Sequence, residues 1–440
     1  MAPLSFDAAA LVDRLRGTFR SGRTRPVAWR REQLGRLRDL LTENSVGITD
    51  AVYEDLQRPH QDSLRAEVNA SVREIDHVLR HLDEWLRPQP VPVDGSPMPP
   101  GTTASTSYDP LGVVLIIGPW NHPVHLLAMP MIGALAAGNT VVVKPSELAP
   151  ATSALFARRV AAYLDSEAVA VVEGAAPETT ALLAQRFDHI FYTGNGAVGR
   201  VVARAAAEHL TPVTLELGGK CPVFVDSTTD LDIAARRLAE SKFANAGQTC
   251  VAPDYVLTDR ATSARLAEKL RDVVTDLYGE DPSRSPRFGR LVNERHFDRV
   301  ERLLSSSGRT VVGGQSDRDD RYVAPTVLVG VSPADPVMQE EILGPILPIV
   351  EVEGLDEAIA YINDHDSPLA LYGFTEDETA RARLTDGTSS GGVAFGQAMW
   401  QLLVPDLPFG GVGESGMGNY HGRSSLATFS HLKSRLDVPA

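Results

Sequence analysis

The sequence predicts an α/β fold in which a parallel sheet carries helices on both faces. From residue 111 onward, short apolar runs alternate with longer segments of helical spacing, an order typical of βαβ units. A second α/β block runs from residue 221 to about residue 395. A chain of 440 residues is long enough for two or three domains with large cores.

The region before residue 111 is expected to contain helices followed by an irregular segment. Apolar residues recur at helical spacing within residues 30–90. Residues 88–110 are too rich in proline and glycine for a helix interior. They fit a flexible linker, but Val91, Val93 and the later alternation of Thr and Ser also suit an extended arm.

Five apolar runs after residue 111 predict buried strands, and three longer segments between them predict helices. Ligands of open α/β sheets bind at the carboxyl ends of the strands, so polar side chains there are the first candidates for a site. The strands are expected at residues 112–118, 140–146, 168–174, 189–194 and 213–219, and the helices at 126–138, 150–164 and 198–210.

Composition and charge argue against several classes of partner. Acidic residues outnumber basic ones by 57 to 42, and the formal net charge of −15 argues against binding to nucleic acid or anionic membranes. No apolar run reaches the ~18 to 20 residues of a membrane span. No H-E-x-x-H or C-x-x-C motif predicts a metal site. The presence of only two cysteines, Cys221 and Cys250, indicates a reducing compartment, so a cytoplasmic location is expected.

The segment FYTGNGAVGR allows two interpretations. Gly194, Gly196 and Gly199 have the G-x-G-x-x-G spacing of a dinucleotide-binding loop, and Glu216 follows 17 residues after the last glycine. Glu216 would then bind the adenosine ribose. Alternatively, Glu216 is a catalyst, because burial in the apolar strand LELGGK would raise its pKa and make it a general base near neutral pH.

Cys250 and Asn121 are the candidates for covalent catalysis. Cys250 follows Gly247, which allows a sharp turn beneath the thiol; the alternative is an inert buried cysteine. A nucleophilic thiol needs a base, and it needs hydrogen-bond donors for the oxyanion that it creates. Asn121 follows an apolar strand, where its side-chain amide is either such a donor or only a turn residue.

Lys144 and Glu147 lie at the carboxyl end of the predicted strand TVVVK. The lysine offers donors to hydroxyl or phosphate groups, and the glutamate can accept two hydrogen bonds from a ribose diol. The alternative is a solvated loop. Glu341, in EEILGP, and the glycine-dense PFGGVGESGMG are further candidates.

Seven motifs, in this order, resemble those of the NAD(P)-dependent aldehyde dehydrogenase superfamily: PWNHP, KPSE, FYTGNGAVG, ELGGK, GQTC, EEILGP and PFGG. The resemblance covers nearly the whole chain. The short N-terminus, PLALYGF and GVGESGMGNYHG are similar to the class 3 branch, which includes fatty and aromatic aldehyde dehydrogenases. The resemblance implies that the chain oxidises an aldehyde to the carboxylic acid with NAD(P)+, through a cysteine thiohemiacetal and a thioester.

The resemblance also implies a role for each candidate. Cys250 would be the nucleophile and Glu216 the general base, while the Asn121 amide and the Cys250 backbone N–H would bind the oxyanion. Gly196 would complete the fingerprint by chance. His122 would face the substrate tunnel. The cofactor would be bound by Lys144, Glu147 on the adenosine ribose, Gly194, Gly199, Glu341 on the nicotinamide ribose, Trp120 and Phe409.

Three departures from the family pattern bear on this site. Leu343 replaces the usual Phe of EEIFGP, so the nicotinamide would be held less firmly. His122 replaces the usual Tyr or Phe, which predicts a more polar tunnel and a substrate with a hydrogen-bonding group. Gly396 and Gln397 replace the Asn–Asp pair of class 3, so substrate assignments do not carry over. Cys221, beside ELGGK, is expected to be structural.

The family's domain plan implies a Rossmann-like cofactor domain, an α/β catalytic domain and a small oligomerisation arm. Class 3 relatives are dimers, so a homodimer is expected. The cofactor domain would comprise residues 1–91 and 111–217, the catalytic domain residues 218–412, and the arm residues 92–110 and 413–440.

Other functions stay open at the level of the sequence. A thiol esterase or acyl-transfer enzyme would use Cys250 and Glu216 without redox turnover, and a catalytically impaired binding protein would only keep the fold. The complete set of candidate side chains argues against the binding protein, and Glu216 as a water-activating base argues against an acyl-CoA-forming enzyme. NAD is favoured over NADP as the cofactor, because Glu147 would repel a 2′-phosphate.

Overall fold

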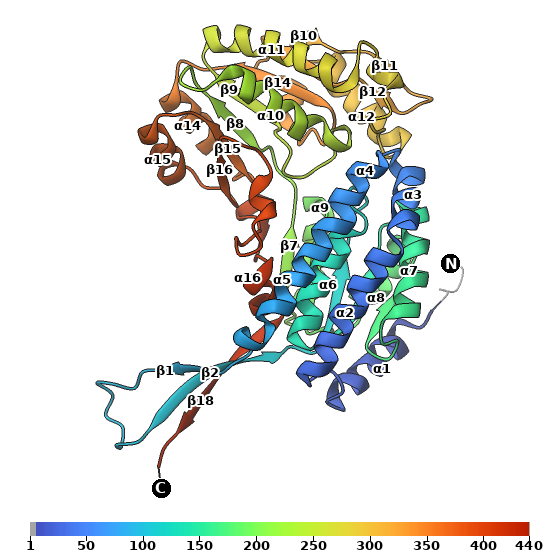
Figure 1. Ribbon diagram of the computed structural model, residues 1–440, viewed down its shortest axis with the longest axis vertical. Helices are drawn as coiled ribbons and strands as arrows, with labels where there is room; N and C mark the ends of the chain where they lie inside the picture. The colour runs from blue at the N-terminus through green and yellow to red at the C-terminus, as the bar shows by residue number, and fades with distance from the viewer. Residues whose placement is uncertain (1–5, 440) are drawn as a thin grey trace.

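The computed structural model describes residues 6–439, and Figure 1 shows two α/β bodies stacked end to end with a thin arm projecting from one of them. The predicted α/β class is confirmed. Residues 1–5 and 440, at the ends of the predicted cofactor domain and arm, lie outside the described residues.

The first body is built on a sheet whose strand order is β17-β7-β6-β3-β4-β5. All of its pairs are parallel except β17 with β7. The chain adds strands to one side of β3 and then to the other, so a crevice opens beyond the carboxyl end of β3. The strands are β3 (Val113–Ile117), β4 (Thr140–Lys144), β5 (Val169–Val171), β6 (His189–Thr193), β7 (Val213–Glu216) and β17 (Gly416–Met417).

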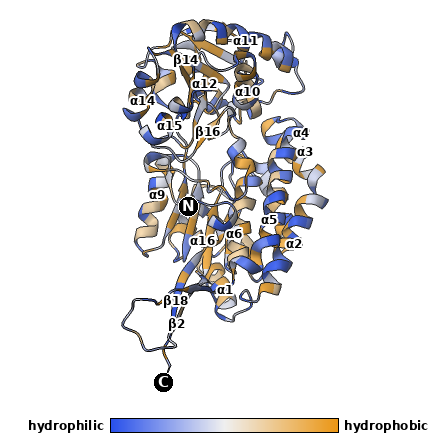
Figure 2. Ribbon diagram, turned by 60° about the vertical axis from the view of Figure 1, so that its left-hand side comes forward, coloured by the Kyte–Doolittle hydropathy of each residue, from blue (hydrophilic) through white to orange (hydrophobic). Residues whose placement is uncertain are grey.

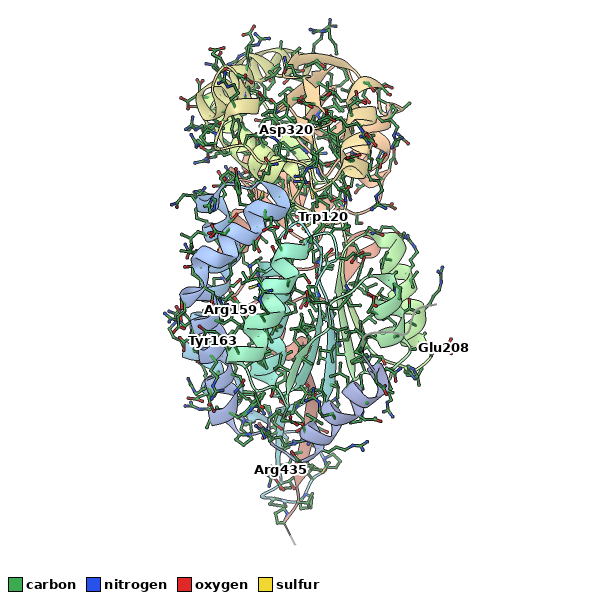
Figure 3. All side chains as sticks on the ribbon, turned by 90° about the vertical axis from the view of Figure 1, so that its right-hand side faces the viewer. Trp120, Arg159, Tyr163, Glu208, Asp320 and Arg435 are labelled. Atoms are coloured by element: carbon green, nitrogen blue, oxygen red, sulfur yellow. The ribbon has the colours of Figure 1, made fainter. Side chains whose placement is uncertain are left out.

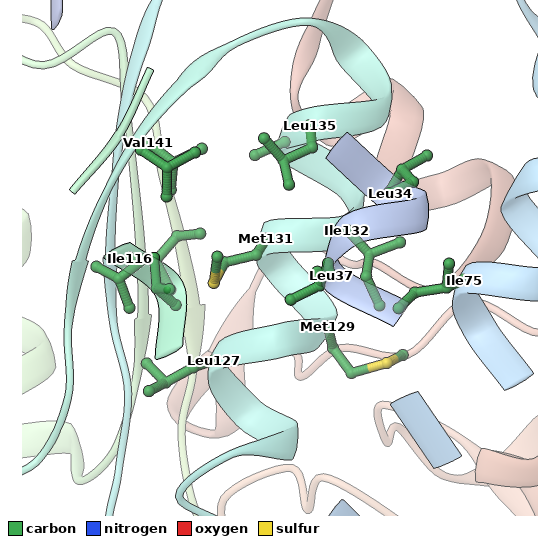
Figure 4. Close-up of a cluster of buried hydrophobic side chains, with 14 of the residues drawn as sticks. Leu34, Leu37, Ile75, Ile116, Leu127, Met129, Met131, Ile132, Leu135 and Val141 are labelled. Atoms are coloured by element: carbon green, nitrogen blue, oxygen red, sulfur yellow. The ribbon is translucent and has the colours of Figure 1, made fainter. Parts of the chain in front are cut away.

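Helices cover both faces of this sheet. One face packs against α1, α8 and α9, and the other against α6, with α2 and α5 in a further layer outside it. Figure 4 shows Leu34, Leu37 and Ile75 of that outer layer directed toward α6. The helices are α1 (Ala8–Arg20), α2 (Val27–Glu43), α3 (Ser45–Leu56), α4 (His60–Ser63), α5 (Ala70–Trp85), α6 (His125–Ala137), α7 (Pro150–Tyr163), α8 (Ala176–Leu183) and α9 (Gly196–Ala207), with a π-helical turn, η1 (Leu64–Asn69), between α4 and α5.

The second body has a seven-stranded sheet in the order β10-β13-β14-β9-β8-β15-β16. Only β10 is antiparallel to its neighbour. Its strands are β8 (Pro222–Val225), β9 (Tyr255–Thr258), β10 (Arg309–Val312), β13 (Thr326–Val329), β14 (Ile346–Glu351), β15 (Leu371–Phe374) and β16 (Val393–Phe395), with a separate pair, β11 (Ser316–Asp317) and β12 (Tyr322–Val323). Its helices are α10 (Leu231–Phe243), α11 (Arg260–Tyr278), α12 (Glu294–Ser305), α13 (Pro336–Gln339), α14 (Leu355–Asn363) and α15 (Glu378–Gly387).

The arm is a three-stranded antiparallel sheet that combines two distant parts of the chain (Figure 1). Segment 88–110 is therefore an extended arm and not a linker. The predicted arm also included helix α16 (Gly422–Thr428), which precedes β18. This helix packs on α6 of the first body and is not part of the arm sheet. The arm strands are β1 (Gln89–Val91), β2 (Thr103–Pro110) and β18 (Ser430–Asp437), with β18 paired to β2 along its whole length.

The distribution of polar residues follows these layers. Figure 2 shows hydrophobic residues concentrated along α6 and the strands, and hydrophilic residues over the outer helices. None of the helices within residues 6–439 is long and apolar enough to cross a membrane. In the same part of the chain, no cluster of three or more His, Cys, Asp or Glu side chains is arranged to hold a metal ion.

Candidate active site

The turn between β3 and α6 brings Trp120 and Asn121 to the junction of the two bodies. Trp120 lies at this junction in Figure 3, and its ring centroid is 4.9 Å from that of His296 in the second body. Asn121 is buried, and its Nδ2 donates to the carbonyl oxygen of Gln248 at 3.1 Å. An amide nitrogen carries two hydrogens, so a second N–H is available for a substrate oxygen.

Cys250 lies on the loop that follows α10 of the second body. This loop has three consecutive residues with positive φ: Asn245 and Ala246 at 52° and Gly247 at 75°. A side chain at position 247 would clash with the carbonyl oxygen of Gly344, so the predicted role of glycine there is sterically enforced. The turn places Asn245 Nδ2 3.0 Å from the carbonyl oxygen of Asn121, which ties the two loops together.

The two cysteines have different environments, and neither is in a disulfide. Cys221 is fully buried, and its Sγ donates weakly to the carbonyl oxygen of Cys250 at 3.5 Å. Cys250 is partly exposed. Burial raises the pKa of the Cys250 thiol to about 12, and the nearby carboxyls of Glu341 and Glu216 contribute to that rise. A thiol in this state is protonated near neutral pH and needs a base before it can attack.

Glu216 lies at the carboxyl end of β7 and is 2% exposed. Within residues 6–439, neither of its carboxyl oxygens has a hydrogen-bond partner. Burial raises the pKa of this carboxyl well above its ordinary value. Buried polar groups without partners are rare and call for an explanation, and a role in proton transfer supplies one.

Glu341 approaches the same region from the second body. Its carboxyl packs directly against Gly218, where any side chain would collide with it. Burial raises the pKa of Glu341 to about 8, with Asp254 adding to the effect. Leu343, two residues later, has φ of 40°, a left-handed conformation that is uncommon for a branched side chain.

Lys144 and Glu147 come together at the carboxyl end of β4. Lys144 is 2% exposed, its Nζ donates to the carbonyl oxygen of Pro145 at 2.6 Å, and it lies 3.7 Å from Glu147 Oε2. Burial lowers the pKa of Lys144, although Glu147 opposes this. A buried ammonium beside a half-exposed carboxylate offers both donors and acceptors, which fits the ribose hydroxyls of a dinucleotide.

The glycines of FYTGNGAVGR differ in what they allow. A Cβ on Gly194 would clash with the Tyr192 hydroxyl, and one on Gly199 would lie 2.8 Å from Leu217 Cδ2. Gly196 begins α9 and faces only the end of the Arg200 side chain. The steric requirement for glycine is therefore at positions 194 and 199.

Phe409 lies between the hydrophobic cores of the two bodies and packs against both. Its ring stacks on His421, with centroids 5.4 Å apart and an interplanar angle of 21°.

Gly396 and Gln397 are the pair that departs from the class 3 pattern, and Gly396 has φ of 70°. The Oε1 atom of Gln397 is buried without a hydrogen-bond partner in the described part of the chain.

His122 has partners on both ring nitrogens. Its Nδ1 lies 3.1 Å from Arg58 Nη1 and 3.2 Å from Glu67 Oε1, and its Nε2 lies 3.2 Å from Thr249 Oγ1. The ring is therefore a bridge within the protein, and its predicted place on the wall of the substrate tunnel stays a prediction. Arg58 and Glu67 were missed because each is one of many charged residues in a helical segment, and only the folded chain reveals that they are buried.

Comparison with known proteins identifies the family of this chain. The chain matches the aldehyde dehydrogenase family over residues 5–435. It is 47% identical to a mouse enzyme named "Aldehyde dehydrogenase, dimeric NADP-preferring", over 97% of this chain and 94% of the mouse protein. It is 48% identical to rat aldehyde dehydrogenase family 3 member A2, over 96% of this chain and 87% of the rat protein.

Among solved structures, the chain is similar to Staphylococcus aureus AldH in a substrate-bound state. The TM-score is 0.95 at 40% identity, and the match covers 98% of this chain and 94% of the other. The resemblance drawn from the motifs, including that to the class 3 branch, is confirmed by these relatives. The chain belongs to the aldehyde dehydrogenase family and is an enzyme that oxidises aldehydes with NAD(P)+.

Proposed function

We propose that Cys250 is the nucleophile of this aldehyde oxidation, Glu216 its general base and Asn121 its oxyanion donor. The observation that carries the proposal is the buried, unpartnered carboxyl of Glu216, which contributes to the raised pKa of Cys250. Leaving a carboxyl unsatisfied inside a protein costs about 1 to 3 kcal/mol or more. A base that must accept protons during turnover is a sufficient reason for that cost.

The proposed reaction has two stages. Ionised Glu216 removes the Cys250 proton, and the thiolate forms a C–S bond to the aldehyde carbon while the carbonyl electron pair moves to oxygen. The Asn121 amide and the Cys250 backbone N–H bind that oxyanion. NAD(P)+, when bound, would supply the acceptor for the hydride of that carbon, which leaves a thioester on Cys250. Glu216 releases the Cys250 proton to solvent and then deprotonates water, and the hydroxide adds to the thioester carbon. Collapse of that intermediate breaks the C–S bond and releases the acid, and Cys250, which leaves as a thiolate, takes its proton back from Glu216.

The proposed cofactor contacts divide between the two bodies. Lys144 and Glu147 would bind the adenosine ribose, the N-terminal part of α9 with Gly194 and Gly199 would lie along the cofactor, and Glu341 would bind the nicotinamide ribose. Trp120 and Phe409 would lie toward the nicotinamide end. The burial of Lys144 and the close packing at both glycines support these assignments.

The expected preference for NAD is not supported by the relatives, because the mouse enzyme is named NADP-preferring. We propose that this chain uses both cofactors. The ammonium of Lys144, 3.7 Å from Glu147 Oε2, offsets part of the repulsion that the carboxylate exerts on a 2′-phosphate.

We propose that the protein is a homodimer assembled through its arm. Strand β18 is an open edge of the arm sheet, with Leu432 and Leu436 about half exposed on one face. An exposed apolar edge strand is a site for pairing with another chain. The mouse relative is named dimeric.

The catalytic roles predict different defects for two substitutions. Cys250→Ala should abolish NAD(P)H formation. Glu216→Gln should lower steady-state kcat roughly 10²- to 10⁴-fold, because water is no longer activated. Absorbance of the reduced nicotinamide measures both, and Cys221→Ala is the matched control, expected to stay active. Turnover by Cys250→Ala would contradict the proposal, and cofactor-independent ester hydrolysis without NAD(P)H formation would favour the thiol esterase.

The raised pKa of Glu216 predicts a stability change with a defined sign. Above the ordinary glutamate pKa of about 4.3, the folded cofactor-free protein keeps a proton that the unfolded chain has released, so its stability falls as pH rises. Glu216→Gln removes this effect. Thermal denaturation should show a gain in Tm for the variant that is about 3 °C larger at pH 8 than at pH 5. An equal gain at both pH values would show that the pKa is not raised.

The position of Glu147 predicts a change in cofactor selectivity. Glu147→Gln removes the repulsion of the 2′-phosphate and should raise kcat/KM for NADP relative to NAD by about tenfold, or roughly 1.4 kcal/mol. Steady-state rates with each cofactor at a fixed aldehyde concentration measure the ratio. An unchanged ratio would mean that the carboxylate does not lie beside the 2′ position.

The exposed face of β18 predicts a dependence of assembly on two leucines. Sedimentation velocity should detect a dimer for the natural chain and a monomer for the double variant Leu432→Glu/Leu436→Glu. Arg435→Glu, on the opposite face of the strand, is the control and should stay dimeric. A monomeric natural chain, or a dimeric double variant, would contradict assembly through this strand.

A further inference from the structure

We propose that Arg58, Glu67 and His122 form a positioning network that holds the Asn121 amide in place against the Cys250 loop. The network acts on the oxyanion through Asn121. The inference rests on the proposed function, in which Asn121 binds the oxyanion and Cys250 is the nucleophile.

The core of the network is an ion pair enclosed within the first body. Arg58 is 1% exposed and Glu67 is 0% exposed, and the Arg58 guanidinium pairs with Glu67 Oε1. Burial alone would raise the pKa of Glu67, but Arg58, together with hydrogen bonds from His122 and the His125 backbone, holds it below its usual range. Both members are therefore charged in the folded protein.

Stability alone does not account for this pair. Removing two charges from water is costly, and replacing a buried ion pair by apolar side chains of similar volume is often neutral or stabilising. Glu67 also lies in the π-helical turn Leu64–Asn69, and such interruptions of a helix occur frequently at functional sites. These features point to a geometric role.

The pair fixes the backbone of the turn that carries Asn121. Arg58 Nη1 donates to the carbonyl oxygen of Asn121 at 3.2 Å. Glu67 Oε2 accepts the backbone N–H groups of Val124 at 3.0 Å and His125 at 2.8 Å. Three backbone groups of a five-residue turn are thus held by Arg58, in the loop between α3 and α4, and by Glu67, in η1, both more than fifty residues earlier in the chain.

His122 extends the network to the nucleophile loop. Its Nδ1 lies between Arg58 Nη1, at 3.1 Å, and Glu67 Oε1, at 3.2 Å, and its Nε2 lies 3.2 Å from Thr249 Oγ1. Burial lowers the pKa of His122, although Glu67 opposes this effect. The lowered pKa favours the neutral form of the ring. Thr249 directly precedes Cys250, so the first body contacts the residue next to the nucleophile.

The position of Asn121 matters because oxyanion stabilisation is sensitive to geometry. Removing one oxyanion donor typically costs about 10² to 10³ in kcat, and a misplacement of about 1 Å can cost about 10². Asn121 is held on its carbonyl oxygen by Arg58 and Asn245, and on its amide nitrogen by Gln248. Loss of the Arg58 contact would leave this amide fixed from the second body alone.

The test is a double-mutant cycle on the rate of the first turnover. The variant Arg58→Met/Glu67→Gln removes both charges together and leaves an oxygen for the two backbone N–H groups. We expect the rate of the NAD(P)H burst to fall about tenfold or more, with the Kd for NAD(P)+ unchanged. In an Asn121→Ala background the same double substitution should cause no further loss, because it acts through that amide. Arg58→Lys should recover part of the lost rate.

The matched control is the Arg16–Asp188 pair at the opposite end of β3. Asp188 accepts from Arg16 at 2.7 Å and from the backbone N–H of Val113 at 2.8 Å. This ion pair therefore also holds a backbone group of β3 in place. Arg16→Met/Asp188→Asn should lower Tm and leave the burst rate unchanged.

The outcomes distinguish a failure of the positioning role of the network from a failure of the oxyanion role of Asn121. If the losses from the network variant and from Asn121→Ala multiply, or if the network variant keeps the full burst rate, the positioning role is wrong. If Asn121→Ala alone leaves the rate unchanged, the oxyanion role of Asn121 is wrong instead. Should the network variant not fold, His122→Phe and Thr249→Val test the same link without disturbing the ion pair. Each should slow the burst, the pair of substitutions no more than either alone, and additive losses would overturn the link.

Discussion

The hydrogen bonds that join the Asn121 turn to the Cys250 loop are the constraint on which the site depends. Asn121 belongs to the first body and Cys250 to the second, so neither body alone contains the proposed reaction centre. Contacts from Asn121 to Gln248 and from Asn245 to Asn121 hold the two loops in register. The left-handed turn at residues 245–247 carries Asn245 and leads to Gln248. Position 247 requires glycine, because any side chain there would clash with the carbonyl oxygen of Gly344.

The electrostatics of the site oppose stability. Two carboxyls, of the buried Glu216 and the partly buried Glu341, lie near the Cys250 thiol, and loss of solvent raises the pKa of all three groups. A fold selected only for stability would not bury a carboxyl that, like that of Glu216, has no hydrogen-bond partner within residues 6–439. The raised pKa of Glu216 instead suits the proposed base, because a carboxylate with a raised pKa accepts a proton more readily.

Much of the fold could be predicted because its signals are local. The five apolar runs after residue 111 all contain strands, since buried parallel strands are read as continuous runs of valine and isoleucine. Motif order identified the family and the candidate residues, and the structure brings Asn121, Glu216, Cys250 and Glu341 toward one junction. The residues of segment 88–110 by themselves fit a linker or an arm, because the pairing partner, β18, lies more than three hundred residues away; the resemblance to class 3 favoured the arm.

The sequence by itself determined the α/β class, the family and the chemistry that the family's side chains can perform, because these follow from hydrophobic period and motif order. Only the tertiary structure decided which charges are buried and what they contact. Arg58 and Glu67 look like any other helical charges until the chain folds around them. His122, predicted to face the substrate tunnel, contacts both Arg58 and Thr249. Burial and hydrogen-bond partnership depend on residues far apart in the chain, and no local pattern encodes them.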